Sequence, residues 1–199
     1  MPVRKIVAGH RSCRGFFWSP KNDSQLAYES TFERDFFYLL ELNKEVLSYE
    51  EQPILIELTW GEETWLYTPD VMVRMRGCDR PLIYEVKPLE DDFPVNKKKA
   101  MNHWCRANGF RFEVIDAKKI RTPELKQAKA LYQYLRFNPS KRAVDSVLQE
   151  VASESSVSVN KLVDIVGCRL GDIYYLIASN KLSCDGIPSR HSMVSISKI

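Results

Sequence analysis

The pattern of hydrophobic and polar positions is most informative at residues 81–88, which read Pro-Leu-Ile-Tyr-Glu-Val-Lys-Pro. The run is apolar and rich in strand-forming residues until Glu85 and Lys87 introduce opposite charges two positions apart. Alternate residues of a strand lie on the same face of a sheet. The segment therefore predicts a largely buried strand whose end places a carboxylate beside an ammonium group, where an unpaired charge is costly.

A second predicted strand, Val71–Met75, precedes this one and is joined to it through a turn at residues 77–79, Gly-Cys-Asp. Two strands connected by a short glycine-containing turn are typical of a hairpin. In such a hairpin, Asp70 lies at the same end as Glu85 and Lys87. The pattern thus predicts two carboxylates and one lysine gathered at one end of the hairpin.

Upstream, residues 29–42 predict an amphipathic helix. Its apolar stripe is formed by Phe32, Phe36 and two leucines at helical spacing. Glu29 and Glu33 lie one turn apart on a neighbouring face. Either glutamate could supply a third acid to the cluster, although a glutamate on a helix is usually a solvated side chain.

Two carboxylates and a lysine in this arrangement predict hydrolysis of a phosphodiester with the help of a divalent cation. Mg²⁺ takes oxygen ligands, so Asp70 and Glu85 could hold it while Lys87 faces the attacking water or the phosphate. This is the layout of the PD…(D/E)xK nucleases. The short pattern alone fits a turn proline and a strand-end salt bridge equally well, so its surroundings decide between the two interpretations.

Those surroundings resemble the TnsA endonucleases, the subunits of Tn7-like heteromeric transposases that cut the 5′ ends of the element. The similarity is carried, in order and spacing, by residues 28–35, 46–53, 67–70 and 83–88, and it continues through a lysine-rich helix at 97–105 and a strand at 110–116. The resemblance implies a restriction-endonuclease-like mixed α/β sheet flanked by helices. It also implies a double-stranded DNA substrate at transposon ends, with the DDE transposase TnsB and the AAA+ regulator TnsC as partners.

The resemblance further implies a set of site residues. Glu33, rather than its neighbour one turn earlier, matches the catalytic acid on the helix, Asp70 matches the metal-binding aspartate, and Lys87 matches the catalytic lysine. Glu85 stands where the family has Glu or Gln, and the carbonyl of Val86 is expected to add a metal oxygen. The implied cofactor is Mg²⁺, with Mn²⁺ as a substitute, in a two-metal arrangement.

The net charge of +3 is unevenly distributed along the chain. Residues 97–142 contain 13 Lys and Arg against 3 Asp and Glu, directly after the proposed catalytic lysine. A charge run is more often a solvated face than a binding site, but beside a phosphodiesterase motif it predicts a phosphate-binding strip. The residues assigned to this DNA-binding strip are Lys97, Lys98, Lys99 and Arg106.

The chain is expected to divide into an N-terminal arm (1–24), a catalytic domain (25–136) and a C-terminal domain (137–199). The sequence of the C-terminal domain predicts short helices at 144–151, 159–166 and 171–178, followed by a small wing. This arrangement resembles the winged-helix domain of TnsA. The predicted recognition helix, 171–178, contains no Lys or Arg, whereas base reading normally uses Arg, Asn or Gln. Docking of a partner protein is therefore favoured over DNA reading, and a structural cap remains an alternative.

The five cysteines are scattered and odd in number, which predicts reduced thiols in a bacterial cytoplasm rather than a disulfide frame. No apolar run has membrane-spanning length. Two other functions are compatible with the same residues. One is a stand-alone restriction or repair nuclease, and the other is a non-catalytic scaffold subunit of a DNA-processing complex.

Overall fold

The computed structural model describes residues 13–197 and divides the chain into two compact units, Met1–Thr122 and Pro123–Ile199. The division falls before α4 (Pro123–Tyr132) and the 3₁₀ helix η2 (Gln133–Arg136), fourteen residues earlier than the predicted domain boundary. Both elements pack within the second unit, because Tyr134 contacts Tyr174 edge-on at 5.1 Å and Gln127 donates to the Cys184 carbonyl. This division differs from the domain boundary expected after Arg136, which stays a prediction.

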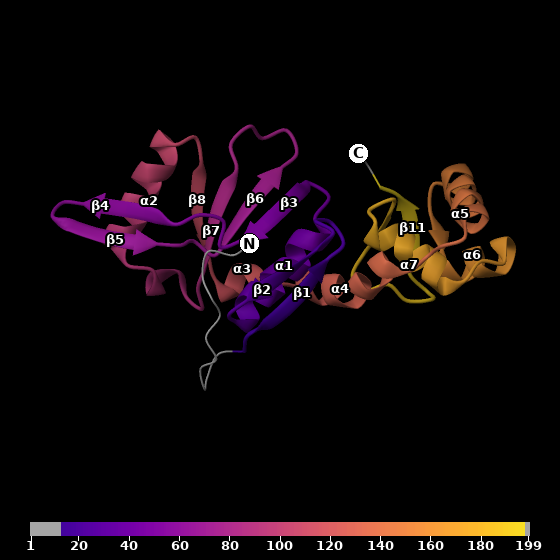
Figure 1. Ribbon diagram of the computed structural model, residues 1–199. Coiled ribbons are helices and arrows are strands. Elements are labelled where there is room, and N and C mark those ends of the chain that lie inside the picture. Colours follow the sequence, from indigo (N-terminus) through magenta and orange to yellow (C-terminus); the bar gives the residue numbers. More distant parts are fainter. Residues whose placement is uncertain (1–12, 198–199) are drawn as a thin grey trace. The chain divides into compact units, whose positions relative to one another are not determined.

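The first unit is built on a four-stranded mixed sheet (Figure 1). Its strands, in spatial order, are β3 (Val46–Glu51), β6 (Val71–Met75), β7 (Leu82–Val86) and β8 (Arg111–Ile115). The β3–β6 and β6–β7 pairs are antiparallel, and β7–β8 is parallel. A mixed sheet flanked by helices confirms the predicted α/β class and is consistent with a restriction-endonuclease-like fold.

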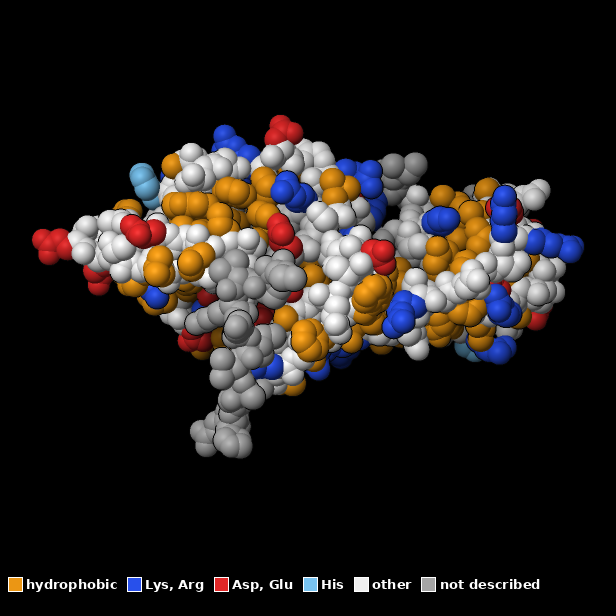
Figure 2. Space-filling view, viewed as in Figure 1, with side chains coloured by type: hydrophobic (Ala, Val, Ile, Leu, Met, Phe, Trp, Pro, Cys, Tyr) orange, Lys and Arg blue, Asp and Glu red, His pale blue; other side chains and the backbone are white. Residues whose placement is uncertain are grey.

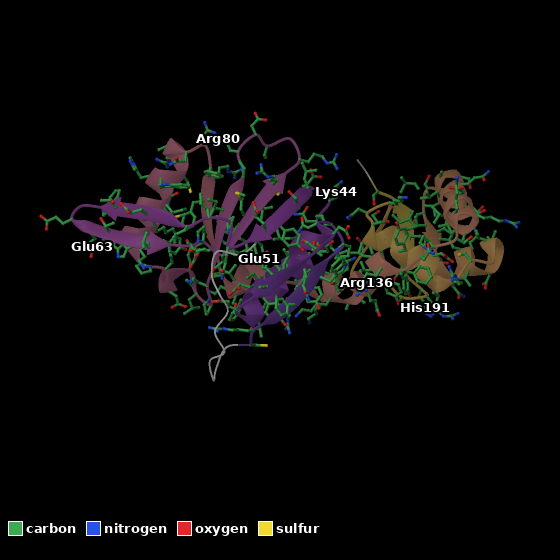
Figure 3. All side chains as sticks on the ribbon, viewed as in Figure 1. Lys44, Glu51, Glu63, Arg80, Arg136 and His191 are labelled. Atoms are coloured by element: carbon green, nitrogen blue, oxygen red, sulfur yellow. The ribbon has the colours of Figure 1, made fainter. Side chains whose placement is uncertain are left out.

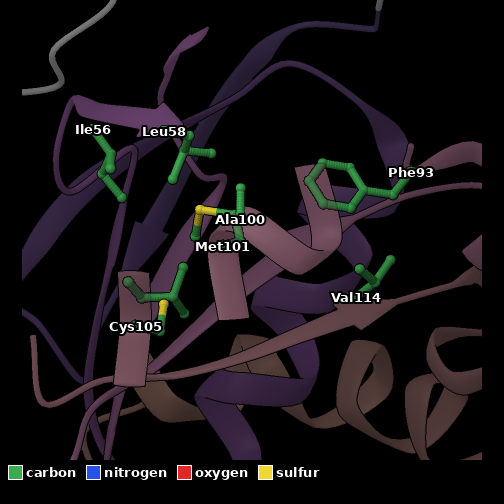
Figure 4. Packing of buried hydrophobic residues seen from close by; sticks show 8 residues of the cluster. Ile56, Leu58, Phe93, Ala100, Met101, Cys105 and Val114 are labelled. Carbon is green, nitrogen blue, oxygen red and sulfur yellow. The ribbon is translucent and has the colours of Figure 1, made fainter. Parts of the chain in front are cut away.

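Helices cover both faces of the sheet, which is why β7 is apolar on both sides. On one face, Phe36 of α1 (Thr31–Leu42) contacts Tyr84 at 4.9 Å between ring centroids. On the other face, α2 (Val95–Ala107) and β4 (Ile56–Trp60) bury Ile83 in a hydrophobic core (Figure 4). That core consists of Ile56, Leu58, Ile83, Phe93, Ala100, Met101, Cys105 and Val114.

Two hairpins accompany the sheet. The first, β1 (Gly15–Ser19) with β2 (Ser24–Tyr28), includes residues assigned from sequence to an N-terminal arm. The rest of that predicted arm, residues 1–12, lies outside the described residues. The second hairpin pairs β4 with β5 (Glu63–Tyr67). The remaining short helices of this unit are η1 (Glu90–Asp92) and α3 (Ala117–Ile120).

A buried polar network fixes the C-terminal end of α1. The carboxylate of Glu41, 4% exposed, accepts from the Ser19 hydroxyl, the Tyr49 hydroxyl and the Lys21 backbone N–H. The Lys21 ammonium donates to the carbonyls of Leu40, Asn43 and Val46 at 2.6 to 2.9 Å. Cations are favourable at helix C-termini, where carbonyls lack helical partners. Lys21 therefore anchors the helix that carries Glu33 at its other end.

Lys21→Met is expected to lower the free energy of unfolding by about 2 kcal/mol, because three carbonyls lose a charged donor and Glu41 loses a nearby cation. Chemical denaturation measures the change. The control is Lys118→Met, which removes an exposed lysine of α3 and should change stability by less than about 0.5 kcal/mol. Equal effects of the two substitutions would contradict the anchoring role.

The second unit combines helices with a small antiparallel sheet. After α4 and η2 come α5 (Lys141–Glu154), α6 (Val159–Val166) and α7 (Leu170–Ala178). The sheet has the order β10 (Leu182–Cys184), β11 (Met193–Ile196), β9 (Val157–Ser158). Ser158 caps α6 as predicted, accepting from the Lys161 N–H. The winged-helix character of this unit stays a prediction.

Helix α7, the predicted recognition helix, forms the core of the second unit. Five of its nine residues are buried, among them Ile173 and Leu176 with no exposed surface. Asp172 is also buried and pairs with Arg169. A helix whose residues are buried in this way has few side chains left for the major groove. Within residues 13–197, no helix has the length and apolar character that crossing a bilayer requires.

Candidate active site

A cleft of about 1030 Å³ in the first unit brings together the residues proposed for catalysis. Three structural elements contribute them: the first turn of α1, the residue preceding β6 and the end of β7. The lining includes Glu33, Asp70, Glu85, Val86 and Lys87. The structure therefore brings residues from three separate parts of the chain into one cavity.

The β6–β7 hairpin explains how Asp70 reaches this cleft. Val71 pairs with Tyr84 across the two strands, so Asp70 lies at the end of the hairpin opposite the β6–β7 turn, which Arg80 marks in Figure 3. One carboxylate oxygen of Asp70 accepts the backbone N–H of Val86 at 2.7 Å. The Asp70 carbonyl accepts the N–H of Gln52. Both hydrogen bonds hold Asp70 at the end of the hairpin that faces the cleft.

Glu85 is buried, with 3% of its surface exposed, and both of its carboxylate oxygens have donors. The Lys87 ammonium forms an ion pair with Oε1, as expected for residues i and i+2 of a strand. The Tyr67 hydroxyl, from β5, donates to Oε2. Glu85 is thus held between a lysine of its own strand and a tyrosine of another hairpin.

Glu33 reaches the cleft from the start of α1, where it also caps the helix. Ser30 is the N-cap residue, and its hydroxyl accepts the Glu33 N–H at 3.1 Å. In return, the Glu33 carboxylate accepts the Ser30 hydroxyl and the Glu29 N–H, both at 2.8 Å. This reciprocal pattern resembles a capping box. Glu29 also lines the cleft, but it is the Glu33 carboxylate that interacts electrostatically with Lys87.

The cleft is lined by four carboxylates, Glu29, Glu33, Asp70 and Glu85, and by two lysines, Lys87 and Lys97, so negative charge is in excess. Burial raises the pKa of Asp70 well above its usual range, and repulsion from Glu85 and Glu33 raises it further. Burial also raises the pKa of Glu33, against the hydrogen bonds that cap the helix. Burial by itself lowers the pKa of Lys87, but the surrounding carboxylates, Glu85 foremost, outweigh it and hold that pKa above its usual value. Lys87 therefore remains charged at neutral pH.

The comparison with known families addresses this part of the chain. Residues 43–117 match the family model described as TnsA-like endonuclease N terminal. This segment is similar to the TnsA-like endonucleases. The match runs from just before β3 to the first residue of α3, and it contains Asp70, Glu85 and Lys87. No curated protein matches the chain in sequence.

The match confirms, for residues 43–117, the resemblance to TnsA-like endonucleases seen in the sequence. Glu33 precedes the matched segment, so its assignment depends on the sequence resemblance and on its position in the cleft. The cleft thus combines the β6–β7 hairpin, which lies within the match, with a helix that lies outside it.

The donors in the cleft suit a hard divalent cation. Mg²⁺ prefers oxygen ligands. The cleft offers the carboxylate oxygens of Asp70, Glu85 and Glu33 and the Val86 carbonyl. A cation would also relieve the repulsion that raises the pKa of Asp70. Among the described residues, no group of three or more His, Cys, Asp or Glu side chains already has metal-binding geometry. His103 and His191 do not line the cleft.

The predicted DNA-binding residues occupy different surroundings on α2. Lys97 lines the cleft and lies over the Trp65 ring at 5.8 Å, whereas Lys98 pairs with Glu90 at 2.6 Å. Lys99 lies over Trp60, and Arg106 is exposed near the end of the helix. Of these four residues, only Lys97 is brought to the cleft.

The β4–β5 hairpin carries negative charge at its outer end. Glu63 lies there in Figure 3, and acidic side chains gather at the same tip in the space-filling view of Figure 2. Such a tip repels phosphate groups. Lys97 at the cleft is therefore better suited than the hairpin end to contact a DNA backbone.

Two residues of the site were not assigned from sequence. Ser30 could have been found, because Ser-x-x-Glu before an apolar helical stripe is a capping-box signature. Tyr67 had no such signal. It is the last residue of a short strand, three positions before Asp70, and only the tertiary structure shows that its hydroxyl donates to Glu85.

Proposed function

We propose that the protein is a Mg²⁺-dependent endonuclease that cleaves the 5′ strand at transposon ends, together with the DDE transposase TnsB and the AAA+ regulator TnsC. The observation that supports this best is the shared cleft of Glu33, Asp70, Glu85 and Lys87 in a TnsA-like domain. Mn²⁺ should substitute for Mg²⁺. The partners and the strand are inferred from the family resemblance.

The residues of the cleft would have different roles in phosphodiester hydrolysis. Asp70, Glu85, Glu33 and the Val86 carbonyl would hold the cation, which supplies Lewis-acid activation of water. Asp70 is kept in place by the Val86 N–H. Lys87, charged at neutral pH, is suited to neutralise the charge that develops on the phosphate and not to remove a proton.

Strand-resolved cleavage of an end-labelled duplex carrying the transposon end tests the proposal. The reaction contains Mg²⁺ or Mn²⁺, with and without a TnsB-type transposase and a TnsC-type ATPase. Cutting confined to the 5′ strand just outside the element, and dependent on the partners, is the expected result. Partner-independent cutting of arbitrary duplex would instead indicate a stand-alone nuclease, and no cutting under any condition would favour the scaffold function.

Lys97 and Lys98 provide a matched pair for testing DNA contact. Lys97→Ala should weaken duplex binding about 3- to 10-fold at moderate salt and reduce the slope of log affinity against log salt by about 1. Lys98→Ala should have a smaller effect, because Lys98 is already paired with Glu90. Fluorescence anisotropy in a cleavage-deficient background measures both. Equal losses would indicate a diffuse positive surface in place of a contact at the cleft.

The second unit is better suited to docking a protein than to reading DNA. Helix α7 is largely buried and contains no Lys or Arg. Base-edge contacts normally need such side chains on an exposed helix. We therefore assign this unit to contact with TnsB or TnsC within the proposed complex.

A further inference from the structure

Tyr67 is placed to orient a carboxylate of the proposed metal site. It ends β5, and its ring packs against Phe93 at 5.8 Å between centroids. Its hydroxyl donates to Glu85 Oε2 from outside the β6–β7 hairpin. The strand that carries Tyr67 is separate from the one that carries Glu85, so this hydrogen bond ties two hairpins together at the cleft.

The hydrogen bond leaves Glu85 able to bind a cation. Each carboxylate oxygen has two lone-pair positions, so Oε2 can accept Tyr67 and Oε1 can pair with Lys87 while further positions stay available. Without Tyr67, Lys87 is the stronger remaining partner of Glu85. The ion pair holds only one of the two oxygens, so the carboxylate could then rotate about it and lose the orientation that suits a cation.

We propose that Tyr67 is a positioning residue that holds the Glu85 carboxylate in the orientation needed to bind a divalent cation. This inference rests on the proposed nuclease function. Hydrogen-bond partners of metal ligands commonly change metal affinity or activity about 10- to 100-fold when they are removed. The tyrosine ring fills space against Phe93, whereas its hydroxyl performs the positioning.

Tyr67→Phe separates these two contributions, because it keeps the ring and removes the hydroxyl. Mn²⁺ binding to the full chain is measured from the electron paramagnetic resonance signal of the free ion. The expected result is an affinity at least about 10-fold weaker than wild type, with an unchanged melting temperature in EDTA. The matched control is Tyr84→Phe, a tyrosine of β7 whose ring packs on Phe36 at the opposite face of the sheet, and it should bind Mn²⁺ as wild type does.

A double-mutant cycle tests whether Tyr67 acts through Glu85. In a Glu85→Ala background, Tyr67→Phe should produce no further loss of Mn²⁺ affinity, because the residue that it orients is gone. Wild-type affinity in Tyr67→Phe, or a full additional loss in the Glu85→Ala background, would overturn the inference while leaving the metal site intact. Absence of saturable Mn²⁺ binding by wild type would overturn the proposed function, and this inference with it.

Discussion

Asp70→Asn is expected to abolish DNA cleavage and, at the same time, to raise the thermal stability of the protein. Asparagine keeps an oxygen that can accept the Val86 N–H, so the local backbone is retained. It removes a charge whose burial beside Glu85 and Glu33 is unfavourable. Loss of a metal-ligating carboxylate should slow cleavage at least about 10³-fold. In EDTA at neutral pH, the melting temperature should rise by about 2–4 °C, which corresponds to roughly 1 kcal/mol.

The gain in stability is expected to depend on pH and on divalent cations. A carboxyl group with a raised pKa in the folded state contributes stability below its unfolded pKa, near 3.8, and loses that contribution as the pH rises through the folded value. The stability difference between Asp70→Asn and wild type should therefore narrow as the pH falls and widen as it rises. Mg²⁺ should stabilise wild type far more than the variant, because ligands that bind the folded state raise its stability.

Two outcomes would contradict this account of Asp70. Cleavage at the wild-type rate by the folded variant would remove Asp70 from the catalytic set. A melting temperature below that of wild type in EDTA would show that the Asp70 carboxylate stabilises the fold, contrary to the repulsion described for the cleft.

Lys87→Met is expected to abolish cleavage too, but with the opposite effect on stability. Methionine retains most of the apolar stem and removes the cation that pairs with buried Glu85. Removing one partner of a buried ion pair is strongly destabilising, and since the Lys87 side chain is 29% exposed we expect about 2 kcal/mol. Cleavage should fall about 10²- to 10³-fold, as for the loss of a donor to a developing negative charge.

Lys98→Met is the control for this substitution. Lys98 forms its ion pair with Glu90 at the surface, so its loss should cost less than about 1 kcal/mol and leave cleavage largely intact. If Lys87→Met cleaves within a few-fold of wild type, the lysine has no role in the chemistry. If it is as stable as Lys98→Met, the ion pair with Glu85 contributes little to the fold.

The elements that depend on local sequence could be predicted from the sequence. The β6–β7 hairpin could be predicted because an apolar run ends in Glu85 and Lys87. Helix α6 could be predicted because Ser158 is a strong N-cap before an apolar stripe. The choice of Glu33 depended on a resemblance rather than on periodicity. Its roles in metal binding and catalysis, like those of Asp70, Glu85 and Lys87, remain predictions for the experiments described above.

Features that depend on tertiary contacts were not predictable. Tyr67 and Glu85 are eighteen positions apart on different hairpins, and Lys21 reaches the end of α1 from a turn that precedes the helix. The domain boundary was predicted after Arg136 because the polar, proline-marked stretch there suggests a joint. In the structure, η2 ahead of it is already held to the second unit by packing of Tyr134 on Tyr174.

The capped start of α1 has a consequence for the charge balance of the cleft. Aligned peptide dipoles give a helix N-terminus a partial positive charge of about half an elementary unit. Through the Glu33 cap, the first turn of α1 brings this charge to a cavity that also contains Asp70 and Glu85. Unlike the ammonium of Lys87, a peptide dipole has no proton to lose. The helix N-terminus therefore continues to offset part of the negative charge of the carboxylates at alkaline pH, where a lysine loses its proton.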